Sequence, residues 1–281
     1  MIMNVRIVFL ILCSGIAFCL KAQESQLSDK AIFDRYLTEM SSRKSLPAGD
    51  LMVETARFFI GCPYVASTLE KEPESLVVNL REMDCMTLVE TTMALVRTLL
   101  DKEPTFDRYR YHLQEARYRN GKINDYTDRL HYTTDWIFEN EQSGRVKDVT
   151  CAIGGKPLKL NLSFMSTHPD SYKPLKNHPE RIAGIAEKEK EINARSYCYI
   201  PETEIDAHAA EIDNGDIVCF VTTVKGLDIS HVGIICREAG KLTFIHASTS
   251  KKQVIVNEES LQDYVQSIKR NSGIMIVRPR F

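Results

Sequence analysis

Residues 84–100 have the sequence DCMTLVETTMALVRTLL, in which an acidic residue precedes a long, mostly apolar stretch. Apolar side chains recur at helical spacing on most of its surface, so we predict a buried helix over 85–100. Asp84, directly before it, is typical of an N-cap. Cys85 then lies in the first turn, where unpaired backbone N–H groups favour a thiolate and can hold an oxyanion. Cys85 is therefore a candidate nucleophile, although a buried helix cysteine is the simpler interpretation of this stretch alone.

Helical patterns surround this stretch in the first half of the chain. Residues 27–40 begin with the candidate caps Ser28 and Asp29, and Asp50 is expected to cap a helix that ends at Gly61. We further predict helices over 105–119, 125–140 and about 179–194. The last of these carries the alternating charges of residues 187–190, which we interpret as a solvated face.

Short apolar strands replace the helices from about residue 146. Residues 146–153 and 158–162 are separated by two glycines, which is typical of a hairpin. An antiparallel meander is expected near the C-terminus, with one helix, about 259–265, before its last strand. The expected strands are 217–222, 230–236, 241–247, 253–256 and 273–277. Helices first and antiparallel strands last predict an α+β fold.

The first 22 residues have the pattern of a secretory signal peptide. Arg6 precedes an apolar stretch over 7–20, and the small residue Ala22 ends the segment. Fourteen helical residues span roughly 21 Å, less than the roughly 30 Å of a bilayer core, although an uncleaved anchor is an alternative. We therefore expect export to the periplasm or cell envelope, and no stable membrane insertion after cleavage.

Composition excludes several classes of protein. Lys and Arg number 36 against 38 for Asp and Glu, so the formal charge of −2 offers no basic field for nucleic acid. None of the eight cysteines forms a C-x-x-C pair, which argues against a structural zinc site or a thiol–disulfide enzyme. Cys219 and Cys236 fall within apolar strands and are expected to be buried. If Cys85 stays reduced, an odd number of mature cysteines remains, so at least one further thiol is expected.

Two histidines add to the prediction that Cys85 is a nucleophile. His231 begins the apolar run 231–236, and His246 lies near the end of the next predicted strand. An antiparallel hairpin would place the start of one strand beside the end of the other, and the two imidazoles within reach. One histidine can then act as base for a cysteine while the other fixes its orientation.

Five short motifs, in this order along the chain, resemble those of the NlpC/P60 superfamily of cell-wall cysteine hydrolases. They are Gly61-Cys-Pro-Tyr64, Asp84-Cys85, Asn214-Gly-Asp-Ile-Val218, Ser230-His-Val-Gly-Ile234 and Phe244-Ile-His-Ala-Ser248. The resemblance implies Cys85 as nucleophile, His231 as general base, His246 as orienting residue and Tyr64 as part of the oxyanion site. It also implies a papain-like core, with N-terminal helices packed on an antiparallel sheet or half-barrel.

The segments 85–90 and 161–168 resemble the DUF1460 branch, whose members are N-acetylmuramoyl-L-alanine amidases. This implies one catalytic domain over 23–281 with a helical insertion at about 101–145, acting on peptidoglycan or muropeptides without metal or organic cofactor. A γ-D-glutamyl-diamino acid endopeptidase and a non-catalytic cell-wall binding protein are the alternatives, because the triad chemistry does not fix the bond that is cut.

Further residues are weaker candidates for oxyanion or substrate binding. Asp84 and Ser230 belong to the motifs themselves. Glu90 could bind a substrate ammonium group or join a buried network, or could form an ordinary structural pair. Ser163 belongs to a polar cluster before Pro169 that suits a sugar or peptide, although it could equally be a simple turn. Asp228 could support His231, but a solvated loop position is the more ordinary interpretation.

Overall fold

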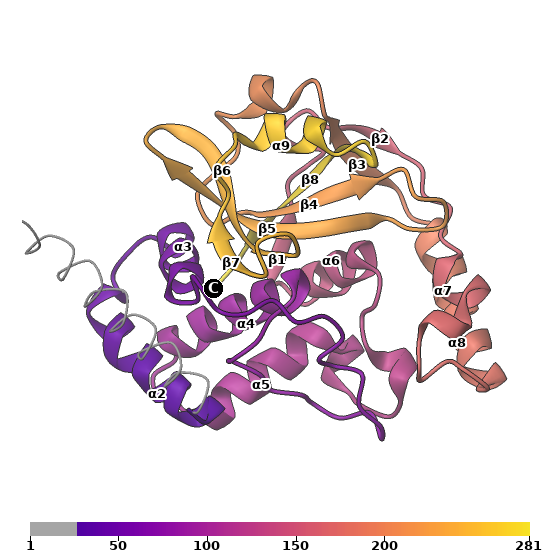
Figure 1. Ribbon diagram of the computed structural model, residues 1–281, viewed down its shortest axis with the longest axis horizontal. Helices are drawn as coiled ribbons and strands as arrows, with labels where there is room; N and C mark the ends of the chain where they lie inside the picture. The colour runs from indigo at the N-terminus through magenta and orange to yellow at the C-terminus, as the bar shows by residue number, and fades with distance from the viewer. Residues whose placement is uncertain (1–26) are drawn as a thin grey trace, which may run out of the picture.

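The computed structural model describes residues 27–281, and the predicted signal peptide over 1–22 lies outside the described residues. The protein has the expected α+β fold, with most helices in the first half of the chain and most strands in the second (Figure 1). The helices are α2 (Asp29–Met40), α3 (Ala48–Phe58), α4 (Cys85–Leu100), α5 (Phe106–Arg117), α6 (Thr133–Gln142), α7 (Phe164–Thr167), α8 (Pro179–Asn193) and α9 (Leu261–Ser267). The strands are β1 (Val146–Asp148), β2 (Lys156–Leu158), β3 (Tyr197–Pro201), β4 (Ile217–Thr222), β5 (Ile229–Glu238), β6 (Lys241–Ser248), β7 (Gln253–Val256) and β8 (Asn271–Pro279).

The helix predicted over 85–100 is confirmed as α4. Asp84 is its N-cap and forms a reciprocal pair with Thr87: the carboxylate accepts the N–H of Thr87 at 2.8 Å, and the Thr87 hydroxyl accepts the N–H of Asp84 at 2.9 Å. Such a capping box satisfies two donors that a helix start leaves unpaired. The predictions for α2, capped by Ser28, and for α8 are also confirmed.

The start and end of α3 differ from the prediction. The helix begins at Ala48 behind Pro47 and ends at Phe58, so Asp50 is in the first turn rather than at the cap. The Asp50 carboxylate instead accepts a hydrogen bond from Asn214 at 3.2 Å. Asp50 therefore joins α3 to the turn before β4.

The helix predicted over 125–140 is also wrong, because α6 begins only at Thr133. Arg129 forms a β-bridge with Tyr118, and the N–H of Leu130 donates to the carbonyl of Arg117. This pairing with the end of α5 requires extended backbone, which interrupts the helix.

The hairpin predicted over 146–162 does not form. β1 pairs with β8, and β2 pairs with β3. The segment after β1 stays bonded to β8. The hydroxyl of Thr150 accepts the N–H of Ile276 at 2.8 Å, and the N–H of the neighbouring Val149 donates to the carbonyl of Ile276. Gly154, with a φ of 100°, lies in the turn between β1 and β2, and β2 then pairs with β3.

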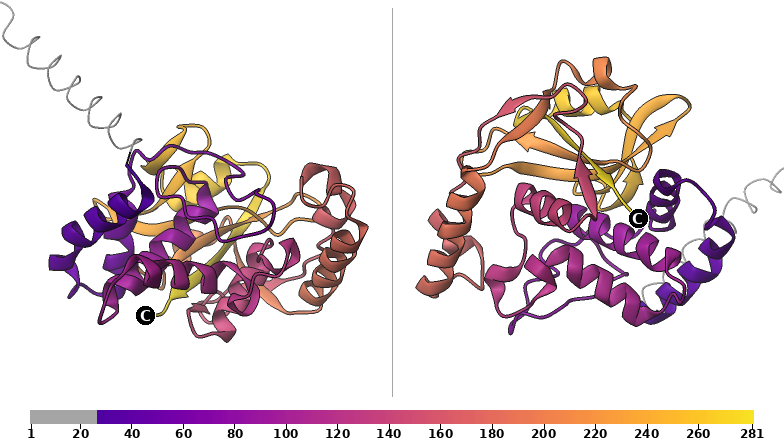
Figure 2. Two further views of the ribbon diagram at one scale, coloured as in Figure 1. Left: turned by 90° about the horizontal axis from the view of Figure 1, so that it is seen from below. Right: turned by 180° about the vertical axis from the view of Figure 1, so that it is seen from behind.

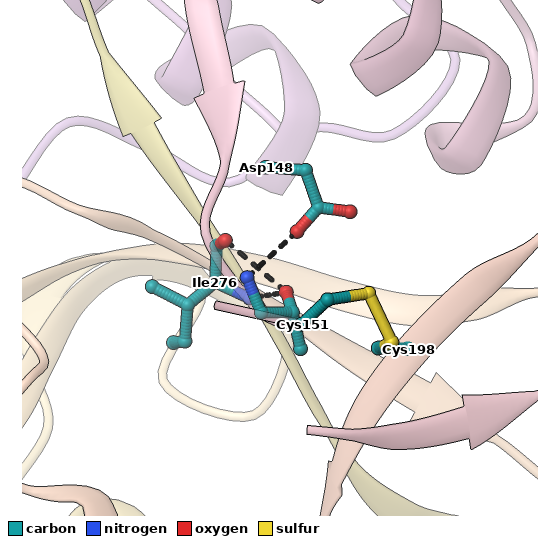
Figure 3. The surroundings of a disulfide bond; sticks show 5 residues. Asp148, Cys151, Cys198 and Ile276 are labelled. Carbon is teal, nitrogen blue, oxygen red and sulfur yellow. Dashed lines mark hydrogen bonds between the residues drawn. A yellow bond between two sulfur atoms is a disulfide. The ribbon is translucent and has the colours of Figure 1, made fainter. Parts of the chain in front are cut away.

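Two cysteines without a predicted role, Cys151 and Cys198, form a disulfide with a sequence separation of 47 (Figure 3). The bond ties the turn after β1 to β3, and the chain between them contains α7 and α8. Cys219 and Cys236 are buried thiols, which confirms the expectation for both residues and for a further thiol besides Cys85.

The strands form one antiparallel sheet in the order β2–β3–β8–β4–β5–β6–β7, with β1 also paired to β8. The meander β4–β7 is confirmed, but the last strand lies against β4 instead of extending the meander beyond β7. The sheet is open, because its end strands β2 and β7 do not pair with each other.

Both faces of the sheet are buried. Ile217 and Cys219 of β4 face the core shared with the helices, whereas Val218 and Phe220 face a second core with Leu261 of α9. Figure 2 shows α9 and the N-terminal helices on opposite sides of the sheet. Successive side chains of a strand point to opposite faces, which explains why β4 is apolar from Ile217 to Val221.

The strands β5 and β6 stop pairing at the end that carries both histidines. Their last paired residues there are Ile234 and Ile245. Beyond them, the N–H of Val232 is directed to the sulfur of Cys85, at the start of α4. The fold therefore joins the start of a helix to the point where two strands separate.

Candidate active site

Cys85 is the first residue of α4 and is partly exposed. Burial, together with the charge of Asp84, raises the pKa of the Cys85 thiol to about 12, although hydrogen bonds from the N–H groups of Val232, Met86 and Cys85 act in the opposite direction. The helix start alone favours a thiolate, as expected from the sequence, but desolvation is the larger effect. The resting residue is therefore a protonated thiol.

The two predicted histidines lie side by side on β5 and β6. Nε2 of His231 and Nδ1 of His246 are 2.7 Å apart, which is hydrogen-bond distance. Burial lowers the pKa of His231 to about 3, to which the neighbouring His246 and the charge of Arg270 contribute. Burial also lowers the pKa of His246 to about 4. Both rings are neutral at physiological pH, and the hydrogen bond between them requires a proton on one of the two facing nitrogens.

Tyr64 is held beside Cys85 by backbone pairing on two sides. Its N–H donates to the carbonyl of Lys252, and it bridges to Met83, which is two residues before Cys85. Burial raises the pKa of Tyr64, and the charges of Cys85 and Asp84 add to this. The phenol therefore stays protonated and can donate a hydrogen bond.

Ser230, next to His231, donates its hydroxyl to the side-chain oxygen of Asn271 at 2.9 Å. Asn271 begins β8, so this bond links the start of that strand to β5, which carries His231. Ser230 is partly exposed and lines the same cavity as Cys85.

A cavity of about 470 Å³ lies where these elements meet. Cys85, His231, His246, Tyr64 and Ser230 all line it. The remaining wall comes from the loop 248–251 after β6, the segment 257–259 after β7, Tyr264 and Ile268 around α9, and the start of β8. The structure thus brings together the three predicted catalytic residues and two of the other candidates.

Glu90 and Ser163 are not brought to this cavity. Glu90 is 2% exposed and forms an ion pair of 2.6 Å with Arg117 of α5. Ser163 precedes α7, and its neighbour Ser166 bonds to Glu189. Of the candidates for oxyanion or substrate binding, Asp84 acts as the helix cap rather than lining the cavity.

Two acidic residues that we expected in solvent are buried. Asp228 is 3% exposed and accepts hydrogen bonds from the N–H and hydroxyl of Thr134, so it neither lies in a solvated loop nor contacts His231. Glu189, within the charged run of α8, is also 3% exposed and accepts the hydroxyl of Tyr132 at 2.7 Å. Asp228 thus joins α6 to the segment before β5, and Glu189 joins α8 to the segments of Tyr132 and Ser166.

Sequence reasoning missed the charged residues of the cavity. Arg270 and Lys251 line it, as do Glu258 and Glu259, and all four are exposed. None of them belongs to a motif or a periodic pattern, and exposed charges are common in any soluble chain. No signal in the sequence distinguishes them.

Residues 27–281 contain neither a candidate membrane span nor a candidate metal site. No helix in this range is long and apolar enough to cross a bilayer. The same residues contain no group of three or more His, Cys, Asp and Glu side chains arranged to hold a metal ion.

The sequence and the fold are similar to those of known amidase-like proteins. Residues 54–274 match the family described as AmiA-like, N-acetylmuramoyl-L-alanine amidase-like. An N-acetylmuramoyl-L-alanine amidase from Bacteroides uniformis is 36% identical, with a TM-score of 0.81, covering 83% of this chain and 99% of its own. A Bacteroides fragilis protein provisionally named a xylanase is 38% identical, with a TM-score of 0.77. The match covers 80% of this chain and 99% of that protein.

A Legionella pneumophila protein of the family DUF1460 shares the fold, at 23% identity and a TM-score of 0.64, covering 90% of this chain and 97% of its own. No curated protein matches the sequence. The family match covers most of the chain and includes Cys85, His231 and His246. The chain therefore belongs to the N-acetylmuramoyl-L-alanine amidase-like family.

Proposed function

We propose that the protein is a cysteine amidase that hydrolyses the bond between N-acetylmuramic acid and L-alanine in peptidoglycan or its fragments. The observation that carries the proposal is the arrangement of Cys85, His231 and His246 around one cavity, with the two histidines 2.7 Å apart. The names of the family and of its Bacteroides uniformis member support the choice of bond.

The reaction begins with a neutral thiol and a neutral imidazole. Nε2 of His231 is occupied by His246, so Nδ1 is left to accept the proton of Cys85 as the sulfur attacks the lactyl carbonyl carbon. The N–H groups at the start of α4 and the hydroxyl of Tyr64 then stabilise the oxyanion. Protonated His231 donates to the leaving alanine nitrogen, and afterwards activates water to hydrolyse the thioester.

This role for His231 fixes the protons on both rings. Nδ1 of His231 must be unprotonated to act as base, so Nε2 carries the hydrogen and donates it to Nδ1 of His246. His246 must then carry its own hydrogen on Nε2, which is buried and has no acceptor among the described residues. His246 acts as a positioning residue that holds the tautomer of the base.

We further propose a papain-like NlpC/P60 core for residues 23–281, with 101–145 as a helical insertion. A cysteine at the start of a helix, packed against histidines on neighbouring antiparallel strands, supports this assignment. We also propose that residues 1–22 direct export to the cell envelope. The disulfide between Cys151 and Cys198 supports an oxidising compartment.

The test is to incubate the reduced, purified protein with a muramyl tripeptide, N-acetylmuramoyl-L-alanyl-γ-D-glutamyl-diaminopimelate, and to identify the products by mass spectrometry. We expect N-acetylmuramic acid and a tripeptide with a new alanine amine. Release of diaminopimelate would instead identify the endopeptidase, and absence of products would favour a binding protein. Xylan serves as a second substrate, because a relative carries the name xylanase.

Cys85→Ala should abolish turnover, whereas Cys236→Ala, which removes a buried thiol outside the cavity, should retain it. His246→Gln keeps an oxygen that can accept the His231 hydrogen, so it should retain more of kcat than His246→Leu. Full activity of Cys85→Ala would refute the cysteine mechanism.

A further inference from the structure

We propose that Arg270 binds the α-carboxylate of the second stem-peptide residue, D-glutamate, and makes the enzyme select fragments in which that carboxylate is not amidated. The inference rests on the proposed function and assigns the peptide side of the same cavity. It uses a cation that the proposed reaction leaves without a role.

Arg270 lies close to the reacting groups. It occupies the turn from α9 into β8 and lines the cavity together with Cys85 and His231. The next residue, Asn271, accepts the hydroxyl of Ser230, which is adjacent to His231. One hydrogen bond and two peptide links therefore connect Arg270 to the proposed base.

The backbone of Arg270 is fixed while its charge is unpaired. Its carbonyl accepts the N–H of Thr223 at 2.8 Å and the hydroxyl of Thr222 at 3.1 Å. Nearly every other arginine of residues 27–281 has its guanidinium bonded to, or within ion-pair distance of, an acceptor; Arg97 and Arg237, for example, donate to backbone carbonyls. Arg280 is the other exception in this range, and it does not line the cavity.

The chemistry of the substrate explains such a cation. The muramic sugar carries no charge once its lactyl carboxyl group forms the scissile amide, so all anions lie on the peptide side. The first is the α-carboxylate of γ-linked D-glutamate, one residue beyond the leaving alanine. A guanidinium can bind a carboxylate through two parallel hydrogen bonds, and a carboxamide cannot accept both.

The experiment compares two muramyl tripeptides that differ in one group: N-acetylmuramoyl-L-alanyl-γ-D-glutamyl-diaminopimelate and its analogue with D-isoglutamine at the second position. We expect the unmodified protein to cleave the carboxylate form with a kcat/KM about 10- to 100-fold higher, as for a charge-assisted hydrogen bond. Arg270→Gln should lose most of this preference, measured as the ratio of the two kcat/KM values, in which any effect of the lost charge on His231 cancels. Arg280→Gln is the matched control and should keep the preference.

Two results would overturn the inference: equal cleavage of both tripeptides by the unmodified protein, or an undiminished preference in Arg270→Gln. If the unmodified protein cleaves neither, the proposed function fails, and the two tripeptides are then titrated into Cys85→Ala by calorimetry. Tighter binding of the carboxylate form that depends on Arg270 would support the inference alone. Equal binding, or none, would overturn it as well.

Discussion

Charged side chains have opposite surroundings in the helical region and around the cavity. Between α4, α5 and α6, Glu90 pairs with Arg117, and Asp135 with both Arg119 and Arg195, all of them largely buried. Around the cavity, the side chains of Arg270, Lys251, Glu258 and Glu259 are exposed, and no ion pair joins them to any described residue.

The difference separates charges that hold the fold from charges that are available to a ligand. A buried ion pair cannot lose one partner without leaving an unpaired charge in a low-dielectric interior. An exposed, unpaired charge contributes little to the free energy of unfolding and can instead meet a charge on a substrate. Variants can test this distinction, and the expected effects decrease in the order given below.

The largest effect is expected at Glu90. Glu90→Gln leaves the guanidinium of Arg117 buried without its counter-charge, so the free energy of unfolding should fall by about 3–5 kcal/mol in a urea titration. Glu259→Gln makes the same change at an exposed position of the cavity and should alter stability by less than about 0.5 kcal/mol. Similar losses in the two variants would show that the contrast between the regions has no energetic basis.

The disulfide should contribute the next largest stabilisation. Replacing Cys151 and Cys198 by alanine releases the segment of 47 residues that the bond closes, which is expected to cost about 2–4 kcal/mol. Neither residue lines the cavity, so kcat/KM at a temperature well below unfolding should stay unchanged. A large loss of activity in the folded double variant would mean that the disulfide also shapes the site.

Acid should destabilise the helical region through His131. Burial lowers the pKa of His131 from 6.5 to about 3, and its Nε2 is 2.8 Å from the carbonyl of Tyr126. The unfolded chain therefore binds a proton that the folded one does not, so this contribution is complete above pH 6.5 and is lost as the pH falls towards 3. His131→Gln should reduce the loss between pH 6.5 and 5 by about 1–2 kcal/mol, measured by urea titrations at each pH. Parallel pH curves for the two proteins would contradict this.

Asp84 should show the smallest effect on stability, but it connects the two regions. Asp84→Ala removes the cap of α4, at a cost of about 0.5–2 kcal/mol. Asp84→Asn keeps an acceptor for Thr87 and should recover most of that loss. Because the cap also sets the conformation of the first turn around Cys85, Asp84→Ala should lower kcat more than Asp84→Asn does. Equal kcat in both variants would show that the cap of α4 does not affect turnover.

Sequence patterns predicted the elements whose periodicity is local. The helix over 85–100 and its Asp84 cap follow from an apolar repeat, and the proximity of His231 and His246 follows from one short hairpin. The residues 146–162 look like a hairpin as well, but their partners β8 and β3 are distant in the chain, and local spacing carries no information about them. Nor does sequence distinguish an acid that becomes buried, such as Asp228, from one that stays in solvent.

The cavity's charges were not predictable for a related reason. Arg270 and Arg117 are the same residue type, and both lie in or near helices. One is buried against Glu90, and the other is left exposed at the cavity. Only the three-dimensional arrangement decides which of them finds a partner.

The disulfide between Cys151 and Cys198 also determines how the protein would respond to a single proteolytic cut. A protease that cuts once between these residues, for example in the turn before α8, leaves two pieces joined through sulfur, with β1 and β3 still anchored on β8. Cys85 precedes this covalent ring in the chain, and His231 and His246 follow it. A nicked molecule would thus migrate as one species until it is reduced, and a single cut there would leave Cys85 linked to both histidines through the disulfide.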